Sequence, residues 1–179
     1  MNKQELRRLK KEIENKSVAD ASIFKTVTGL SFFHEAHMIF IYLNTDNEPS
    51  TDDIIMKALE LGKAVCVPVC HKPPVMTAHR IESLNDLVMN RYGIREPAEN
   101  TPVVSPDAID LAIIPCVKAS SDGKRLGHGG GYYDYYLKDT CCLKACLCYR
   151  ENITEDIEAE SHDILMDYVI TQDTIFKAQ

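Results

Sequence analysis

Residues 38–69 have the sequence MIFIYLNTDNEPSTDDIIMKALELGKAVCVPV. The first six of them form an almost wholly apolar run, which is typical of a strand buried on both faces. Ser50 to Asp53 then supply hydroxyl and acidic groups suited to the start of a helix, which we expect to end near Gly62. A second apolar run follows at 64–69. Strand, helix and strand in this order predict an α/β fold.

The same alternation continues along the chain. We expect helices at 3–15, about 19–32 and about 131–138, and further strands at 76–81, 110–115, 144–149 and 166–171. Residues 90–106 carry three prolines and little periodicity, so we expect a long surface connection there. The pattern predicts an α/β, single-domain three-layer sandwich with a mainly parallel sheet, Rossmann-like in architecture.

The composition is that of an ordinary globular domain. Apolar residues make up 45% and charged residues 26% of the 179 residues, a length suited to one core. The net charge of −7 argues against a broad surface for nucleic acid. The apolar runs are far too short to span a membrane, and the polar residues 1–5 do not resemble a signal peptide. We therefore expect a cytoplasmic protein that binds neither nucleic acid nor membrane.

Seven cysteines raise the question of a zinc or disulfide site. Their number is odd and no secretory signal is expected, which argues against a disulfide framework. The four cysteines at 141, 142, 146 and 148 lack the paired C-x-x-C spacing of a zinc site. Cys146 and Cys148 alternate with Leu147, as on one face of a strand. Because free cysteine packs as a small hydrophobic residue, we favour a place in the core.

Four of the eight glycines lie within residues 127–131, in the segment GKRLGHGGGYYD at 123–134. Glycine tolerates positive φ and lets main-chain N–H groups approach an anion closely. The segment follows the strand expected at 110–115 and precedes a helix, the place where open parallel sheets bind ligands. It matches neither the Walker loop nor the dinucleotide fingerprint, which needs glycine or alanine where Tyr132 stands. We expect a phosphate-binding loop.

Polar and aromatic residues flank these glycines. Arg125 suits a bidentate contact with phosphate, and Asp134 suits Mg²⁺ that bridges phosphate oxygens. Tyr132 and Tyr133 offer flat surfaces to an aromatic ligand. The alternative is a glycine-rich turn capped by Asp134, with both tyrosines packed in the core. The residues alone leave that alternative open.

Residues 125–134, RLGHGGGYYD, resemble the signature of the 5-formyltetrahydrofolate cyclo-ligase family, also called methenyltetrahydrofolate synthetases. Weaker blocks agree with the family in order and spacing over nearly the whole chain. These blocks lie at 3–7, 42–48, 92–97, 110–115, 162–163 and 169–171. The resemblance implies a single cyclo-ligase domain over residues 1–179.

Enzymes of this family convert 5-formyltetrahydrofolate to 5,10-methenyltetrahydrofolate, with ATP as co-substrate and with Mg²⁺. The formyl oxygen attacks the γ-phosphate and gives a phosphorylated imidate, after which N10 closes the ring and phosphate leaves. The protein's part in such a transfer is mainly positioning and charge neutralisation. The resemblance therefore implies a ligase whose partners are the small molecules folate and ATP, and no obligate protein partner is evident.

The resemblance also implies roles for individual residues. Those implied for ATP are Lys3, Arg7, Arg125, Leu126, Gly127, His128, Gly129, Gly130, Gly131, Tyr132 and Tyr133. Those implied for the folate substrate are Leu43, Glu48, His128, Gly129, Gly130, Gly131 and Tyr132. Asp134 and Asp163 are implied as magnesium ligands, and we assign the catalytic role to Arg125, Tyr133 and Asp134. Taken without the resemblance, Lys3 and Arg7 would be a solvated helix face.

One loop departs from the family pattern. Where the family resembles P-G-x-A-F-D, residues 115–120 are PCVKAS, so Ala119 and Ser120 replace an aromatic and an acidic residue. We expect weaker stacking on the substrate and a new anion contact at Lys118. Two alternative functions stay open: a folate- or nucleotide-binding relative, and an ATP-dependent enzyme acting on another amide-like substrate.

Overall fold

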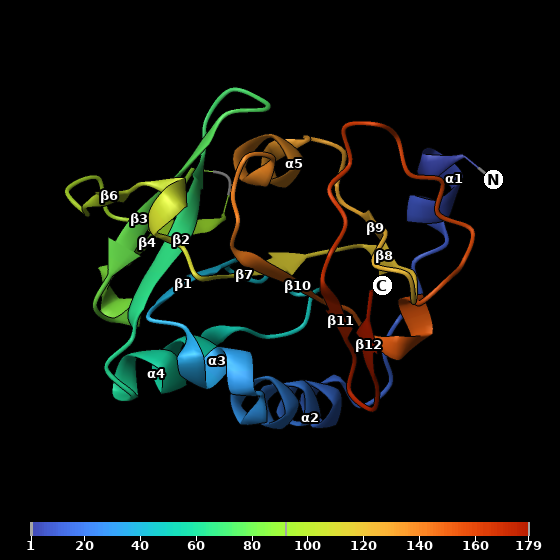
Figure 1. Cartoon of the computed structure of the whole chain (residues 1–179), viewed down its shortest axis with the longest axis horizontal. Coiled ribbons are helices and arrows are strands. Elements are labelled where there is room, and N and C mark those ends of the chain that lie inside the picture. Colours follow the sequence, from blue (N-terminus) through green and yellow to red (C-terminus); the bar gives the residue numbers. More distant parts are fainter. Residues whose placement is uncertain (1, 92, 179) are drawn as a thin grey trace.

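The computed structural model describes residues 2–91 and 93–178, so Tyr92 of the 92–97 block lies outside the described residues. Within these residues, one sheet has eight strands in the order β12-β11-β10-β7-β1-β2-β3-β6 (Figure 1). The strands are β1 Met38–Ile41, β2 Ala64–Cys70, β3 Met76–Ile81, β6 Val103–Val104, β7 Leu111–Pro115, β10 Leu143–Leu147, β11 Tyr168–Ile170 and β12 Ile175–Lys177.

The sheet is mainly parallel, as predicted. The neighbouring strands β11, β10, β7, β1 and β2 all run in the same direction. β12 and β3 pair antiparallel with the outer members of this group, and β6 adds a short antiparallel pairing to β3. The carboxyl ends of β1, β7 and β10 therefore meet at one edge of the sheet.

Helices cover both faces of the sheet and complete three layers. Figure 1 shows α2 (Lys16–Gly29), α3 (Ser31–Glu35) and α4 (Asp52–Glu60) along one face and α5 (Tyr132–Leu137) over the other. The alternation of side chains along β1 explains this arrangement. Ile39 and Ile41 are buried in one hydrophobic cluster, whereas Phe40 is buried in a second cluster together with Leu137 of α5.

Smaller elements surround the sheet. The helix α1 (Lys3–Arg8) packs Leu6 against Leu126 and Ile157 in a separate small cluster. Two hairpins pair β4 (Leu87–Met89) with β5 (Arg95–Pro97) and β8 (Lys118–Ala119) with β9 (Arg125–Leu126). The 3-10 helices are η1 (Leu84–Asp86), η2 (Pro106–Ala108) and η3 (Arg150–Asn152). Every helix in the described part of the chain is too short or too polar to cross a bilayer.

Three predicted boundaries were wrong. The helix expected at 3–15 ends at Arg8. Leu6 packs against Leu126 and Ile157, Leu9 is 54% exposed, and Ile13 reaches the main hydrophobic cluster from a segment that is not helical. The helix expected at 19–32 is divided between α2 and α3, since Leu30 adopts an extended backbone. The connection expected at 90–106 contains β5 and β6, each of which gains its hydrogen bonds from a partner strand.

The cysteines follow the interpretation as core residues in five of seven cases. Cys66, Cys116, Cys142, Cys146 and Cys148 are buried in the second hydrophobic cluster, beside Phe40. Cys146 and Cys148 share that cluster, as their alternation with Leu147 predicted. Cys70 and Cys141 are exposed.

Candidate functional site

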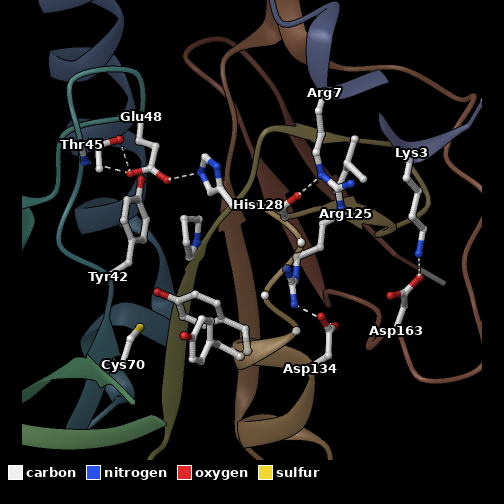
Figure 2. A pocket seen from close by; sticks show the side chains of 18 of the residues that line it. Lys3, Arg7, Tyr42, Thr45, Glu48, Cys70, Arg125, His128, Asp134 and Asp163 are labelled. Atoms are coloured by element: carbon white, nitrogen blue, oxygen red, sulfur yellow. Dashed lines mark hydrogen bonds and ion pairs between the residues drawn. The ribbon is translucent and has the colours of Figure 1, made fainter. Parts of the chain in front are cut away.

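A cavity of about 590 Å³ opens where β1 and β7 end, and Tyr42 and Pro115 form part of its wall. Figure 2 shows side chains from several distant segments that converge on it. All residues that the sequence analysis assigned to ATP, substrate or metal line this cavity. They are Lys3, Arg7, Leu43, Glu48, every residue from 125 to 134, and Asp163. The structure brings the predicted site together, while the role of each residue stays a prediction.

The glycine loop forms one wall through conformations that other residues rarely adopt. Gly129 has a φ of +101° and Gly131 has a φ of +66° at the start of α5. A Cβ on Gly130 would lie 2.6 Å from the ring of Tyr132. Arg7 fixes the loop from the opposite side, since its Nε donates to the Gly127 carbonyl at 2.8 Å. The loop therefore has a fixed conformation, held by its glycine backbone and by Arg7.

Arg125 is a cation held inside the protein. Its side chain is only 5% exposed, its Nη2 donates to Asp134 Oδ1 at 2.8 Å, and its guanidinium carbon lies 5.8 Å from the centre of the Tyr133 ring. Its buried Nε finds no hydrogen-bond partner among the described residues. A buried donor without a partner is costly. An anionic ligand in the cavity is the kind of partner that would satisfy it.

Asp134 does not cap the helix that contains it. Gly131 stands at the N-cap position, and Asp134 Oδ1 instead accepts from Arg125 and from the Ile164 N–H at 3.1 Å. The alternative of a turn capped by Asp134 is therefore wrong. Tyr133 packs partly against both hydrophobic clusters while still lining the cavity. Burial raises the pKa of Tyr133 far above its usual value, so its hydroxyl stays protonated.

Lys3 and Asp163 form a second charge pair at the same end of the cavity. Lys3 Nζ lies 2.7 Å from Asp163 Oδ2 and 3.0 Å from Glu160 Oε1. Burial alone would lower the pKa of Lys3, but the hydrogen bonds to Asp163 and Glu160 outweigh it and the pKa is raised. Burial alone would raise the pKa of Asp163, but the Glu160 N–H and Lys3 outweigh it and the pKa is lowered. Both side chains are therefore charged at neutral pH.

Glu48 lies at the other end of the cavity and is only 4% exposed. Its Oε2 accepts from the Thr45 N–H at 2.8 Å and from the Thr45 hydroxyl at 2.9 Å, and its Oε1 lies 3.1 Å from His128 Nε2. Burial alone would raise the pKa of this carboxyl, but the bonds from His128 and Thr45 outweigh it and the pKa is lowered. A buried carboxylate with these partners remains available to a polar ligand.

The cavity thus has two chemically different ends. Figure 2 shows Lys3, Arg7, Arg125, Asp134 and Asp163 on one side and Tyr42, Thr45 and Glu48 on the other, with His128 between them. The first end combines cations with carboxylates and suits a polyanion and its counterion. The second end contains the Glu48 carboxylate, and Leu43 and Ile94 add apolar side chains to the cavity lining. A carboxylate in a partly apolar cavity suits a flat ligand that carries N–H donors.

The oxygen atoms at the first end fit the requirements of Mg²⁺ in part. Mg²⁺ prefers oxygen ligands and is often bound by one or two carboxylates together with substrate phosphates. Asp134 and Asp163 provide two such carboxylates, each with one oxygen already bound to a cation. Within residues 2–91 and 93–178, no group of three or more His, Cys, Asp or Glu side chains is arranged to hold a metal. Phosphate oxygens would have to supply the remaining ligands.

Sequence reasoning missed several lining residues and misplaced one loop. Thr45, Cys70, Ile94, Glu160 and His162 also line the cavity. Thr45, Ile94 and His162 lie inside the blocks at 42–48, 92–97 and 162–163, so the family resemblance could have pointed to them, whereas Cys70 and Glu160 lie outside every block. The expected anion contact at Lys118 was wrong. Lys118 is buried in β8, which pairs with β9, and residues 116–120 do not line the cavity.

Fold and site together define the class: an α/β protein that binds small molecules at its strand ends, in a cavity rich in anion-binding groups. The sequence model of the 5-formyltetrahydrofolate cyclo-ligase family matches residues 2–172, so the chain belongs to this family. The resemblance of residues 125–134 to the family signature is thereby confirmed.

Individual relatives agree with this assignment. The probable 5-formyltetrahydrofolate cyclo-ligase of Caenorhabditis elegans is 31% identical over 163 residues, covering 83% of this chain and 79% of the relative. The mitochondrial 5-formyltetrahydrofolate cyclo-ligase of Arabidopsis thaliana is 32% identical over 192 residues, covering 93% of this chain and 67% of the relative. The NMR structure of Aquifex aeolicus 5,10-methenyltetrahydrofolate synthetase has a TM-score of 0.85 at 24% identity, covering 99% of this chain and 93% of that one. This last likeness shows a shared fold.

Proposed function

We propose that the protein cyclises 5-formyltetrahydrofolate to 5,10-methenyltetrahydrofolate, consuming ATP in the presence of Mg²⁺ and releasing ADP and phosphate. The observation that carries this proposal is the two-ended cavity. Its cation-rich end suits the polyphosphate of ATP, and its Glu48 end suits the pterin ring of folate. Family membership supports the same reaction.

The reaction needs activation because the oxygen of a formamide is a poor leaving group. The formyl oxygen attacks the γ-phosphorus of ATP, the bond from that phosphorus to the bridging oxygen breaks, and ADP departs. N10 of the folate then attacks the activated formyl carbon and closes the ring. The C–O bond breaks, phosphate leaves with the bonding electrons, and N10 loses its proton. The enzyme's task is to align these groups and to balance the charge of the phosphates.

The cations of the first end hold ATP in this proposal. Arg125 contacts the transferred phosphate, because its buried Nε has no partner among the described residues and its position is fixed by Asp134. Lys3 and Arg7 bring further positive charge from α1. Asp134 and Asp163 would hold Mg²⁺, which would neutralise charge on the phosphate oxygens.

The folate occupies the second end in this proposal. Glu48 accepts hydrogen bonds from the N–H groups of the pterin edge, and Leu43 packs against the ring. The glycine loop and Tyr132 lie between the two ligands. Tyr133, which stays protonated, donates a hydrogen bond rather than removing a proton.

Two further assignments belong to this proposal. We regard residues 1–179 as a single domain, which is supported by the one continuous eight-stranded sheet of the described residues.

We place the protein in the cytoplasm, acting on small molecules without nucleic acid, membrane or an obligate protein partner.

The test is an absorbance assay on purified protein. Protein, 5-formyltetrahydrofolate, ATP and Mg²⁺ should produce the near-ultraviolet band of the methenyl product, with one phosphate released per molecule of product. Omitting ATP or Mg²⁺ should abolish both signals. Binding of ATP without any product would favour a folate- or nucleotide-binding relative. Phosphate release with a different amide-like substrate, but not with the formylfolate, would favour the other alternative.

A further inference from the structure

The loop that carries Glu48 is held by three hydrogen-bond contacts, two buried and one partly buried. Three consecutive residues of this loop each bond through the main chain to a side chain from elsewhere in the fold. The Glu48 carbonyl lies 3.1 Å from the Tyr149 hydroxyl, and the Pro49 carbonyl accepts from the Tyr42 hydroxyl at 2.7 Å. The Ser50 N–H donates to Asp20 Oδ1 at 3.1 Å.

These contacts come from three separate elements. Asp20 lies in α2, Tyr42 follows β1, and Tyr149 follows β10. Tyr42 and Tyr149 are 1% and 2% exposed, so neither hydroxyl exchanges its partner freely for water. A loop tied to two strands and a helix at successive residues has little freedom to shift against the sheet.

Asp20 and Tyr149 are themselves coupled. The Tyr149 hydroxyl lies 2.6 Å from Asp20 Oδ1, while Asp20 Oδ2 accepts from Lys16 at 2.8 Å. A phenol carries one hydrogen, so the short bond to the charged Asp20 carboxylate is the stronger one and the contact with the Glu48 carbonyl is the weaker. The carboxylate therefore fixes the hydroxyl beside Glu48 and fixes the Ser50 N–H at the same time.

Neither Asp20 nor Tyr149 lines the cavity. They cannot act on a ligand by direct contact, and they reach the site only through the loop. At the far end of the same loop, Thr45 directs the Glu48 carboxylate with two hydrogen bonds. Through this loop, the contacts of Asp20 and Tyr149 outside the cavity determine where the Glu48 carboxylate lies inside it.

We propose that Asp20 and Tyr149 are positioning residues for the substrate, which hold the Glu48 loop so that its carboxylate meets the N–H edge of the folate ring. This inference rests on the proposed function and extends it to two residues outside the cavity. A carboxylate that must meet a planar donor edge needs support of this kind, since small displacements weaken such contacts steeply.

The experiment is a double-mutant cycle on equilibrium binding of 5-formyltetrahydrofolate, measured by titration calorimetry. We expect Tyr149→Phe to weaken binding roughly fivefold, because the Glu48 carboxylate is then held less firmly against the ring. In a Glu48→Gln background the same substitution should change affinity less than about twofold, because the carboxylate that it positions is gone. The affinity for ATP should be unchanged in every variant.

Two further variants make the binding experiment interpretable. Tyr168→Phe removes the hydroxyl of a half-buried tyrosine that also lies outside the cavity, and it should leave both affinities unchanged. Asp20→Ala removes the oxygen that accepts from both Tyr149 and Ser50. It should give the same pattern as Tyr149→Phe, and it replaces that variant if Tyr149→Phe folds poorly. Tyr149→Phe could lower the affinity for 5-formyltetrahydrofolate equally with and without the Glu48 carboxylate, or lower it in neither background. Either result would overturn the positioning role, while turnover by the wild-type protein would still uphold the proposed function. A wild-type protein that neither binds nor converts the formylfolate would overturn both.

Discussion

Arg125 Nη2 lies 2.8 Å from Asp134 Oδ1, so the cation proposed for phosphate and a carboxylate proposed for magnesium are bonded to each other. Lys3 and Asp163 repeat the relationship at 2.7 Å. Each pair keeps charges of opposite sign together in a partly buried site, where an isolated charge is costly. When ATP and Mg²⁺ bind, the phosphates would give Arg125 and Lys3 a new negative partner, and Mg²⁺ would give Asp134 and Asp163 a new positive one. Each ion pair could then separate without leaving a buried charge unpaired.

Asp134→Asn should lower turnover about 100-fold or more, since the substitution removes a charge from the phosphate site at constant volume. The melting temperature should also fall, because Arg125 loses its buried counter-charge. Turnover is measured by the methenyl absorbance and folding by circular dichroism. Asp139→Asn, an equal change at an exposed residue just beyond α5, serves as the control. Full activity of Asp134→Asn would remove Asp134 from the metal site.

Substitutions at the two ends of the cavity should affect different substrates. Arg125→Lys should raise the KM for ATP about tenfold, because lysine cannot reproduce the planar fork of the guanidinium. It should leave the KM for 5-formyltetrahydrofolate within about twofold, and Glu48→Gln should give the opposite pattern. Steady-state kinetics with each substrate varied in turn test this. A rise in both constants for either variant would contradict the separation of the two ends.

The parts of the fold that depend on local pattern were predictable. Runs such as 38–43 and 64–69 show in the sequence because buried strands need apolar side chains whatever their neighbours are. The short strands β5 and β6 are strands only because they pair with β4 and β3, and their sequences show no apolar run or alternation that would predict them. The end of α1 at Arg8 was also missed, since the charged residues that follow carry no local signal such as glycine or proline to end a helix.

The site divides in a similar way. The glycine loop could be found from composition, because positive φ values require glycine at particular positions such as 129 and 131. The support for Glu48 could not be found, since Thr45, Tyr149 and Asp20 are ordinary residues whose importance comes only from folding together. The prediction for Lys118 was wrong because it rested on a departure from the family pattern and not on the fold. Lys118 lies in the hairpin of β8 and β9, away from the cavity.

Alanine substitutions of three glycines should differ in sign and size. Gly29→Ala should stabilise the protein by up to about 1 kcal/mol, since Gly29 ends α2 in open space without a positive φ. Gly131→Ala should destabilise it by about 1 kcal/mol, the cost of a left-handed backbone. Gly123→Ala should be worse than either, because it adds a collision with the Met166 carbonyl to a positive φ. Urea denaturation gives the ranking, and a stable Gly123→Ala variant would contradict it.

Glu48 should make the folded state sensitive to acid. Its pKa lies below the ordinary value of 4.5, so as the pH falls the unfolded chain takes up this proton before the folded protein does. The stabilisation from the charged carboxylate is therefore complete above pH 4.5 and is lost as the pH falls through the lower, folded pKa. Glu48→Gln removes the titrating group, so the difference in unfolding free energy between wild type and variant should change in favour of the variant from about pH 6 to about pH 4. Urea denaturation at both pH values measures it. A difference that stays constant, or that shifts toward the wild type at low pH, would mean that the contacts of Glu48 with His128 and Thr45 do not hold the carboxyl in its charged form.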